Sequence, residues 1–260
     1  GFGVIMEVSG LYRPGLRRGM PRIKKAGRVS WHSRIVLRTT LFLIVFGWAA
    51  FLLTEPVGRI EGPGAGWWTH VLASLFQSVT SRTAGFNTVE IGGMTNASLL
   101  VLILLMFIGG SPASCAGGIK TTTFRSLLAF AWASIKGRQQ IVLGRFALSR
   151  ETVNKVMSLV IFSLVLIFGA VFLLLLIEGG GVPHPQAHGL FLELLFECVS
   201  AFATVGLSTG VTPELSPAGK GVIIVLMFTG RLGLILFLSL LQSWQRTDRF
   251  SRAEESLMVG

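Results

Sequence analysis

Two short polar segments, each carrying one glycine, interrupt an otherwise hydrophobic chain. SRTAGFNT spans residues 81–88 and FATVGLST spans 202–209, and aligned on Gly85 and Gly206 they share T-x-G-x-x-T at an offset of 121 residues. Glycine permits the positive φ values that turn successive backbone carbonyls the same way. Such carbonyls can replace the water shell of a cation, so the segments indicate ion coordination by the backbone. A plain glycine turn is the alternative, but it must then occur twice.

These segments lie inside an internal repeat. Each half contains an apolar span, a loop, a half-length helix, the glycine-bearing loop and an interrupted span. Non-helical backbone at membrane depth is costly unless it is buried in protein or lines a wet cavity. The predicted elements are 35–53, 54–69, 70–81, 82–93 and 99–135 in the first half, and 156–177, 178–187, 188–201, 202–217 and 219–242 in the second.

The composition is that of an integral membrane protein. Of the 260 residues, 51% are hydrophobic and 13% are charged, and the mean hydropathy is +0.69. A bilayer span takes about 20 apolar residues, and residues 35–53 and 156–177 come close to or exceed that length. Residues 70–79 and 189–199 are about half as long and suit re-entrant helices. We therefore expect an all-α integral membrane fold.

Lysine and arginine gather in three regions of the chain. Nine lie between residues 13 and 38, seven between 120 and 155, and three between 246 and 252, whereas the other loops are rich in glutamate. The positive-inside rule then puts both termini and the middle loop in the cytoplasm. The net charge of +11 does not indicate nucleic-acid binding, because the basic residues flank spans and lack interleaved aromatics. Contact with the lipid bilayer or an acidic cytosolic partner explains them better.

Three longer segments carry a resemblance to a known family. SVTSRTAGFNTVE, FIGGSPASCAGGIKTTTF and FECVSAFATVGLSTGVTPELSPAGKGVIIVLMFTGR closely resemble the Trk/Ktr/HKT superfamily of potassium and sodium transporters, most nearly the TrkH and KtrB pore subunits. The resemblance implies four membrane-pore-membrane repeats around one pore, of which this chain holds the third and fourth. The missing N-terminal half would then supply two further repeats.

By that resemblance, each glycine-bearing segment contains one filter strand. The transported ion would be potassium or sodium, held at the filter carbonyls only, with no covalent cofactor. Because the family has one glycine per strand, we expect loose discrimination between the two ions, and the sequence leaves that choice open. The first filter strand is Thr83, Ala84, Gly85, Phe86 and Asn87, and the second is Thr204, Val205, Gly206, Leu207 and Ser208.

Small and polar residues break the first interrupted span at residues 109–123. A kinked helix is one interpretation, since membrane helices tolerate glycine and proline. A phosphate-binding loop is disfavoured, because Ile119 separates Gly118 from Lys120 and no strand precedes the segment. The resemblance instead implies an intramembrane gate loop beneath the filter that moves when the pore opens. Its residues are Gly109, Gly110, Ser111, Pro112, Ala113, Ser114, Cys115, Ala116, Gly117, Gly118 and Lys120.

Arg231 interrupts the last apolar span. An arginine at mid-membrane costs roughly 2.5–3.5 kcal/mol, so it must face a cavity or a partner unless it snorkels to the interface from a helix end. In the resembling proteins this arginine lies in the pore beside the gate loop. We expect it to repel cations in the closed state and to help hold the loop.

Acidic and nucleophilic side chains give weaker indications of function. Glu193 and Glu197 lie four apart near the start of the second half-helix, where we expect them to favour the helix dipole and to concentrate cations at the pore mouth. Ser111 and Cys115 have no histidine beside them in sequence, so the chain offers no arrangement for an intramembrane hydrolase. We expect no enzyme.

The predicted organisation has five parts. Residues 1–34 are the end of a preceding membrane helix with a basic cytoplasmic linker, 35–135 the third-type repeat with the gate loop, 136–155 a basic cytoplasmic loop, 156–242 the fourth-type repeat, and 243–260 the cytoplasmic C-terminus.

This organisation predicts monovalent cation uptake across the cytoplasmic membrane. The resemblance implies two kinds of protein partner, a second copy in a homodimer and a cytosolic ring of nucleotide-binding regulatory subunits. The middle loop and residues 246–252 are the expected docking face for that ring. A non-conducting membrane sensor or receptor subunit of the same fold is the alternative.

Overall fold

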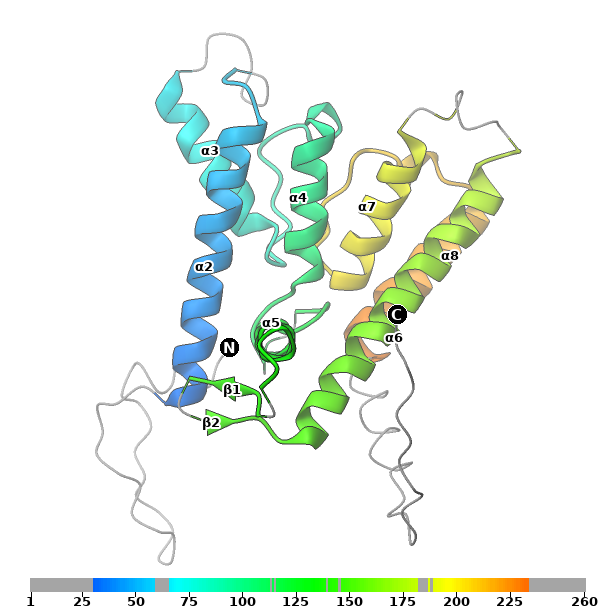
Figure 1. The fold of residues 1–260 in the computed structure, drawn as a ribbon. Coiled ribbons are helices and arrows are strands. Elements are labelled where there is room, and N and C mark those ends of the chain that lie inside the picture. The colour runs from blue at the N-terminus through cyan, green and yellow to red at the C-terminus, as the bar shows by residue number, and fades with distance from the viewer. Residues whose placement is uncertain are drawn as a thin grey trace, which may run out of the picture.

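The computed structural model describes residues 30–58, 66–112, 114, 116–138, 140–144, 146–181, 187 and 189–233. The preceding helix, the C-terminal segment, Ala113 and Cys115 lie outside these residues. The described chain is mainly helical, and its two repeats lie side by side (Figure 1). The first repeat contains α2 (Trp31–Thr54), α3 (Trp67–Thr80) and α4 (Asn96–Phe107), and the second contains α6 (Arg150–Glu178), α7 (Leu190–Ala203) and α8 (Pro217–Phe228).

Two helices, α2 and α6, are long and apolar enough to cross a membrane. Their outward faces carry exposed aliphatic and aromatic side chains such as Leu41, 64% exposed, and Val165, 65% exposed, which suits contact with lipid. The remaining helices of each repeat are shorter, at 14 residues for α3 and α7 and 12 for α4 and α8. The predicted all-α class with half-length helices is therefore confirmed.

In both repeats, the short helix that follows the predicted filter strand is hydrogen-bonded to the end of the long helix. Glu55 accepts hydrogen bonds from the backbone N–H of Thr95 at 2.7 Å and from its hydroxyl at 2.9 Å. Glu178 does the same with the N–H of Ser216 at 3.0 Å and its hydroxyl at 2.6 Å. Thr95 and Ser216 are the N-caps of α4 and α8, where a carboxylate also favours the helix dipole.

The core lies where the two repeats meet. Helix α4 packs against α7 and α2, and α7 packs in turn against α6 and α8. Leu102, Met106, Phe196 and Phe202 are fully buried there. Gly47 in α2 permits close packing of the first repeat, because a Cβ at this position would lie 2.5 Å from the Ser78 hydroxyl and 2.6 Å from Leu105. The loops that contain the predicted filter strands are thus attached to a packed core.

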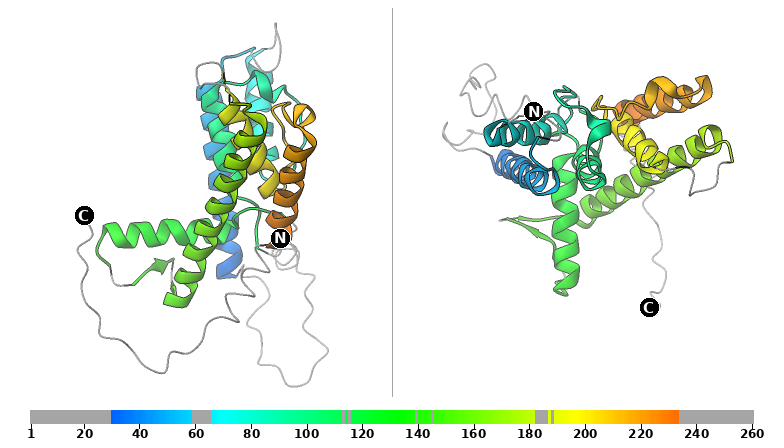
Figure 2. Two further views of the ribbon diagram at one scale, coloured as in Figure 1. Left: turned by 90° about the vertical axis from the view of Figure 1, so that its right-hand side faces the viewer. Right: turned by 90° about the horizontal axis from the view of Figure 1, so that it is seen from above.

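Helix α5 (Thr121–Ile135) differs from its prediction. It runs crosswise to the other helices instead of continuing α4 (Figure 2), so residues 99–135 form no single broken span. The chain can turn here because Ile108 and Ile119, at the two ends of the intervening loop, form a bridge. Helix α5 also packs against α2 and α6.

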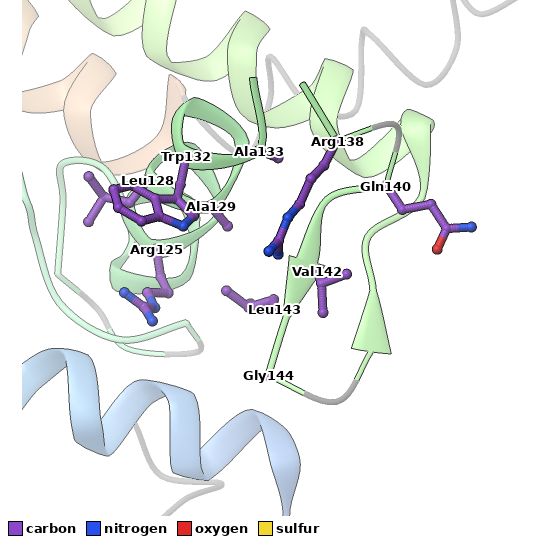
Figure 3. Close-up of a pocket in the computed structure, with 10 residues that line it drawn as sticks. All are labelled: Arg125, Leu128, Ala129, Trp132, Ala133, Arg138, Gln140, Val142, Leu143 and Gly144. Atoms are coloured by element: carbon purple, nitrogen blue, oxygen red, sulfur yellow. The ribbon is translucent and has the colours of Figure 1, made fainter. Parts of the chain in front are cut away.

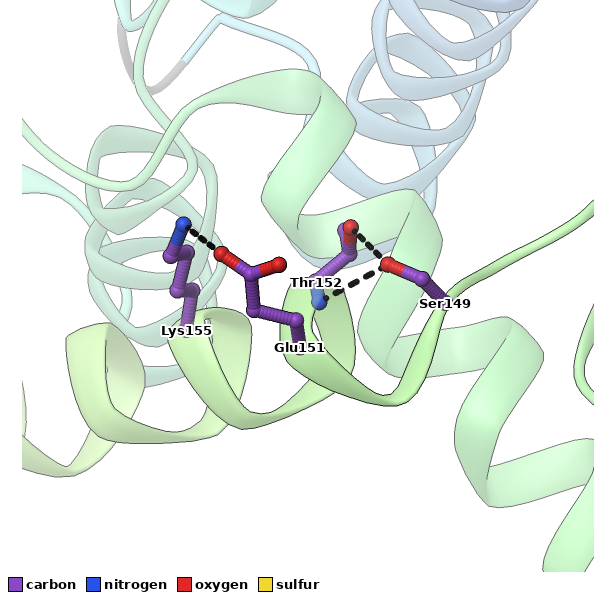
Figure 4. A network of polar contacts seen from close by, with 4 residues as sticks. All are labelled: Ser149, Glu151, Thr152 and Lys155. Atoms are coloured by element: carbon purple, nitrogen blue, oxygen red, sulfur yellow. Dashed lines mark hydrogen bonds and ion pairs between the residues drawn. The ribbon is translucent and has the colours of Figure 1, made fainter. Parts of the chain in front are cut away.

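The middle loop is more ordered in structure than its basic composition suggested. It contains a hairpin of β1 (Val142–Leu143) and β2 (Phe146–Ala147), and α6 begins at Arg150 rather than near residue 156. The Ser149 hydroxyl caps α6 by accepting from the backbone N–H of Thr152 at 3.2 Å, and Glu151 pairs with Lys155 at 2.5 Å (Figure 4). Strands this short carry no readable periodicity, which is why the hairpin was not predicted.

Candidate filter and gate

Both glycine-bearing segments follow directly after the short helices α3 and α7 and have the same unusual backbone. Gly85 has φ of +73° and Gly206 of +90°, which confirms the positive φ predicted for them. Thr83, at +66°, and Thr204, at +53°, are the two non-glycine residues with positive φ in the described chain. This conformation costs roughly 1–3 kcal/mol for such residues and persists only where the surroundings impose it. Its occurrence at matching positions marks both loops as specialised.

Hydroxyl groups hold the far end of each filter strand. The Thr80 hydroxyl donates to the carbonyl of Phe86 at 2.7 Å, and the Ser200 hydroxyl donates to the carbonyl of Leu207 at 2.5 Å. These carbonyls therefore point back toward α3 and α7. Both hydroxyls come from the last turn of the preceding helix, so each strand is tied to the helix from which it emerges.

The carbonyls nearer the start of each strand have a different environment. The N–H groups of Ala84 and Gly85 donate to Thr80, and that of Val205 donates to Ser200. The carbonyls of residues 83–85 and 204–206 accept no hydrogen bond from any described residue. Ala84 and Gly206 are exposed in the described chain, so water or an ion can approach these loops. Six carbonyls thus have no hydrogen-bond partner among the described residues.

The two strands approach each other closely although they belong to different repeats. A Cβ atom at Gly85 would overlap the carbonyl oxygen of Val205 and lie 3.7 Å from the Cα of Gly206. Seven residues after Gly85, a Cβ at Gly92 would lie 2.6 Å from the carbonyl oxygen of Thr209. The structure therefore brings together the two segments that the repeat predicted, with a glycine at their nearest approach.

Glu197 has contacts that the sequence did not predict. It is 4% exposed, and its carboxylate accepts hydrogen bonds from the Ser208 hydroxyl at 2.7 Å, the Thr209 N–H at 2.9 Å and the Thr212 hydroxyl at 2.5 Å. Glu197 therefore anchors the loop after the second filter strand, and it also lines the cavity beside that strand, so its expected attraction for cations at the pore mouth stays a prediction. The hydroxyl-rich sequence STGVT was the signal that could have revealed the anchoring role.

The predicted gate loop, residues 109–120, is a closed loop rather than a kinked helix. Ile108 and Ile119 form a parallel bridge. The N–H of Ile119 donates to Phe107 at 3.1 Å, and that of Thr121 donates to Gly110 at 3.2 Å. These contacts bring the two ends of the loop together, as in compact loops packed on their own atoms.

The gate loop contacts both filter segments. The N–H of Gly117 donates to the Thr204 hydroxyl at 2.9 Å, and a Cβ at Gly117 would lie 2.9 Å from the carbonyl oxygens of Phe202 and Ala203. On the other side, the guanidinium of Arg82 donates to the carbonyl of Gly109 at 3.0 Å. The loop therefore lies directly against the ends of both filter segments that face the gate.

Two cationic side chains accompany the loop. The ammonium of Lys120 donates to the carbonyls of Ala116 and, at 3.4 Å, Ser114, so it braces the loop from within. Arg231 lies in a π-helical turn, Thr229–Gly233, and lines a pocket of about 1020 Å³ together with Thr204 and Gly206. Turns of this kind are frequent at functional sites. Arg231 thus lines a cavity beside the second filter strand. This position agrees with the expectation that an arginine at mid-membrane avoids lipid.

The structure gathers most of the predicted site in one place. Gly85 of the first strand and Gly117 of the gate loop each lie against the second filter strand, and Arg231 lines a cavity with that strand. Sequence reasoning missed the positive φ of the two threonines and the contacts of Arg82. Among the described residues, no group of three His, Cys, Asp or Glu side chains comes together to hold a metal ion.

Comparison with known proteins relates the chain to cation transporters. The TrkH family, described as cation transport proteins, matches residues 35–245. The chain is 39% identical over 212 residues to the Ktr system potassium uptake protein B of Bacillus subtilis, covering 80% of this chain and 45% of that protein. It is 36% identical over 242 residues to the potassium/sodium uptake protein NtpJ of Enterococcus hirae, covering 92% and 51%.

A solved structure shows the same fold. The potassium transporter TrkH from Vibrio parahaemolyticus matches with a TM-score of 0.62 at 21% identity, covering 82% of this chain and 45% of that one. The chain spans about half the length of the relatives that it matches. A family of transport proteins also favours a transporter over an enzyme.

Proposed function

Because the chain belongs to the TrkH family of cation transport proteins, we propose that it supplies two of the four filter strands in a pore for monovalent cation uptake. Potassium is the first candidate ion and sodium the second, in keeping with the names of the two relatives. The observation that carries this proposal is the pair of strands with six carbonyls that accept no hydrogen bond in the described chain. Two further repeats, outside this sequence, would complete the ring.

Selection and dehydration occur at these strands. The carbonyls of residues 83–85 and 204–206 replace part of the water shell of the ion. Helices α3 and α7 end where the strands begin, so the partly negative ends of their dipoles face the ion. The strained Thr83 and Thr204 hold the carbonyls in place before the ion arrives, which lowers the ordering cost of binding it.

The gate loop closes the path beneath the filter. In the arrangement described above, Thr204 and Arg82 tie the loop to the filter segments and Lys120 braces it from within. Arg231 places a positive charge beside the second strand, where it repels cations while the loop is closed. Opening requires the loop to leave Thr204 and to carry Lys120 with it.

The protein is proposed to lie in the cytoplasmic membrane with both termini in the cytoplasm. Two apolar helices of spanning length and the clustered lysines and arginines support this orientation. We propose pairing into a homodimer and docking of a ring of nucleotide-binding regulatory subunits on the cytoplasmic side. The basic middle loop, with the hairpin and the start of α6, is the docking face that the described residues offer.

Rubidium uptake by cells distinguishes a pore from a sensor. The full-length gene that contains this chain is expressed in a host without its own potassium uptake. Uptake above an empty-vector control, competed by potassium, supports the proposal. Expression in the membrane without uptake, in the presence of the regulatory subunit, would favour the non-conducting sensor.

A further inference from the structure

A second cavity lies between α5 and the β-hairpin, at the end of the bundle away from the filter loops. It has a volume of about 410 Å³. Figure 3 shows that its walls come from the side chains of Leu128, Trp132 and Leu143, and that Arg138 reaches from the end of α5 toward the hairpin. Arg125 adds a second guanidinium at the rim. The cavity is thus an apolar groove with two cationic groups.

An adjoining pocket extends this groove toward the membrane-facing side of α2. It has a volume of about 280 Å³ and shares Arg125, Leu128 and Leu143 with the first. Arg38 and Phe42 of α2 also line it, and Phe42 is 59% exposed. The two pockets together are lined by three arginines, Arg138 in the first, Arg38 in the second and Arg125 in both, and the second also borders apolar side chains of α2.

The described residues provide no counter-charge for the arginines of this groove. Among the described residues that line the two pockets, none is an aspartate or glutamate, and none of Arg38, Arg125 and Arg138 makes an ion pair with a described residue. Arginines that line adjoining pockets without a carboxylate favour an anion that accepts several hydrogen bonds. Arginine suits phosphate in particular, because its planar fork donates two parallel hydrogen bonds.

The groove is held open by contacts that do not depend on a ligand. The indole N–H of Trp31, in the first turn of α2, donates to the carbonyl of Leu143 at 3.1 Å. Its ring lies edge-on against Phe146 with centroids 5.1 Å apart. The hairpin is therefore fastened to α2, and α5, turned crosswise, forms the opposite wall. This preformed shape lowers the cost of binding.

We propose that this groove binds the headgroup of an anionic phospholipid. Its phosphodiester lies between Arg125 and Arg138 with Arg38 beside it, and its acyl chains run along Phe42 and the exposed face of α2. Basic pockets at the cytoplasmic ends of membrane helices suit such headgroups. A free phosphate would use the arginines but not the apolar walls. The inference rests on the proposed membrane orientation, since anionic lipid is offered at the cytoplasmic leaflet.

Native mass spectrometry of the full-length protein tests this site. Delipidated protein in detergent is exposed to phosphatidylglycerol or phosphatidylcholine. We expect phosphatidylglycerol to bind preferentially, and the double variant Arg125→Gln/Arg138→Gln to bind it roughly 25-fold more weakly, at about fivefold per arginine. Arg150→Gln is the matched control, because it removes a nearby arginine that does not line the groove. Equal binding by all three proteins overturns the proposal.

Further measurements distinguish the lipid from other possible ligands of the groove. Displacement of the lipid by millimolar inorganic phosphate would assign the arginines to free phosphate and overturn the lipid proposal. Loss of regulatory-subunit binding in the double variant, with lipid binding intact, would assign them to protein docking and also overturn it. If the double variant does not keep the wild-type unfolding temperature, the single variant Arg138→Gln replaces it, with a loss of roughly fivefold expected. Rubidium uptake is measured in parallel, so failure of lipid binding and failure of transport are read separately.

Discussion

The carbonyl oxygen of Val205 occupies the space that a side chain at Gly85 would need. The two residues are 120 positions apart and belong to different repeats, yet they meet at the centre of the proposed filter. A glycine at this point therefore has two functions, since it adopts a positive φ and it admits the neighbouring strand.

Gly85→Ala is expected to abolish most transport. Alanine at positive φ costs roughly 1–2 kcal/mol, and its methyl group would also displace the Val205 carbonyl. Rubidium uptake should fall by about tenfold or more, an effect of roughly 1.4 kcal/mol on the barrier. Gly169→Ala, in α6 with open space around it, serves as the control and should leave uptake unchanged. Wild-type uptake by Gly85→Ala would refute the close approach.

Thr204 should hold the gate loop through its hydroxyl. Thr204→Val keeps the side-chain shape but removes the acceptor for the Gly117 N–H, which is worth about 0.5–1.5 kcal/mol. We expect basal uptake without the regulatory subunit to rise by roughly two- to tenfold. Thr204→Ser retains the hydroxyl and should behave like the wild type. If the valine and serine variants show the same basal uptake, the contact does not hold the gate loop closed.

Lys120 should stabilise the closed loop from within. Lys120→Met removes its hydrogen bonds to Ser114 and Ala116, so the loop should open more easily and rubidium uptake without the regulatory subunit should increase. Lys136→Met removes a lysine that lies 4.4 Å from the centre of the Trp132 ring, away from the gate loop. An identical response in both variants would mean that only the net charge matters.

Glu197 is expected to matter for stability. Glu197→Gln leaves a single carbonyl oxygen to serve Ser208, Thr209 and Thr212, and hydrogen bonds to charged groups contribute about 1.5–3 kcal/mol each. The unfolding temperature of the solubilised protein should fall by roughly 5 °C or more. Glu193→Gln on the same helix tests whether the charge alone is responsible. Equal shifts in the two variants would argue against the anchoring role.

The general layout could be predicted from the sequence, because it depends on local composition. Apolar length identified the long helices, and the repeated glycine at positions 85 and 206 located both loops and their positive φ. The clustered small residues of 109–120 indicated a loop where a span was expected. Each of these features is decided within a few residues of the chain.

Other features depend on contacts between distant segments. The crosswise direction of α5 follows from the closure of the loop by Ile108 and Ile119, and the hairpin is fixed by Trp31, 112 residues before Leu143. The anchoring role of Glu197 was missed because its partners lie 11 to 15 residues later and reach it only when the filter loop folds back. A pattern within one segment does not reveal these pairings.

Rubidium flux into proteoliposomes, with Gly206→Ala compared with the wild type, tests the central claim most directly. Gly206 has φ of +90° and no atom within 4 Å of a Cβ at that position, so alanine strains the filter backbone without causing a clash. If the carbonyls of the second strand coordinate the ion, flux should fall roughly tenfold while the unfolding temperature falls by only a few degrees, and Gly169→Ala should keep wild-type flux. Wild-type flux through Gly206→Ala would contradict the account.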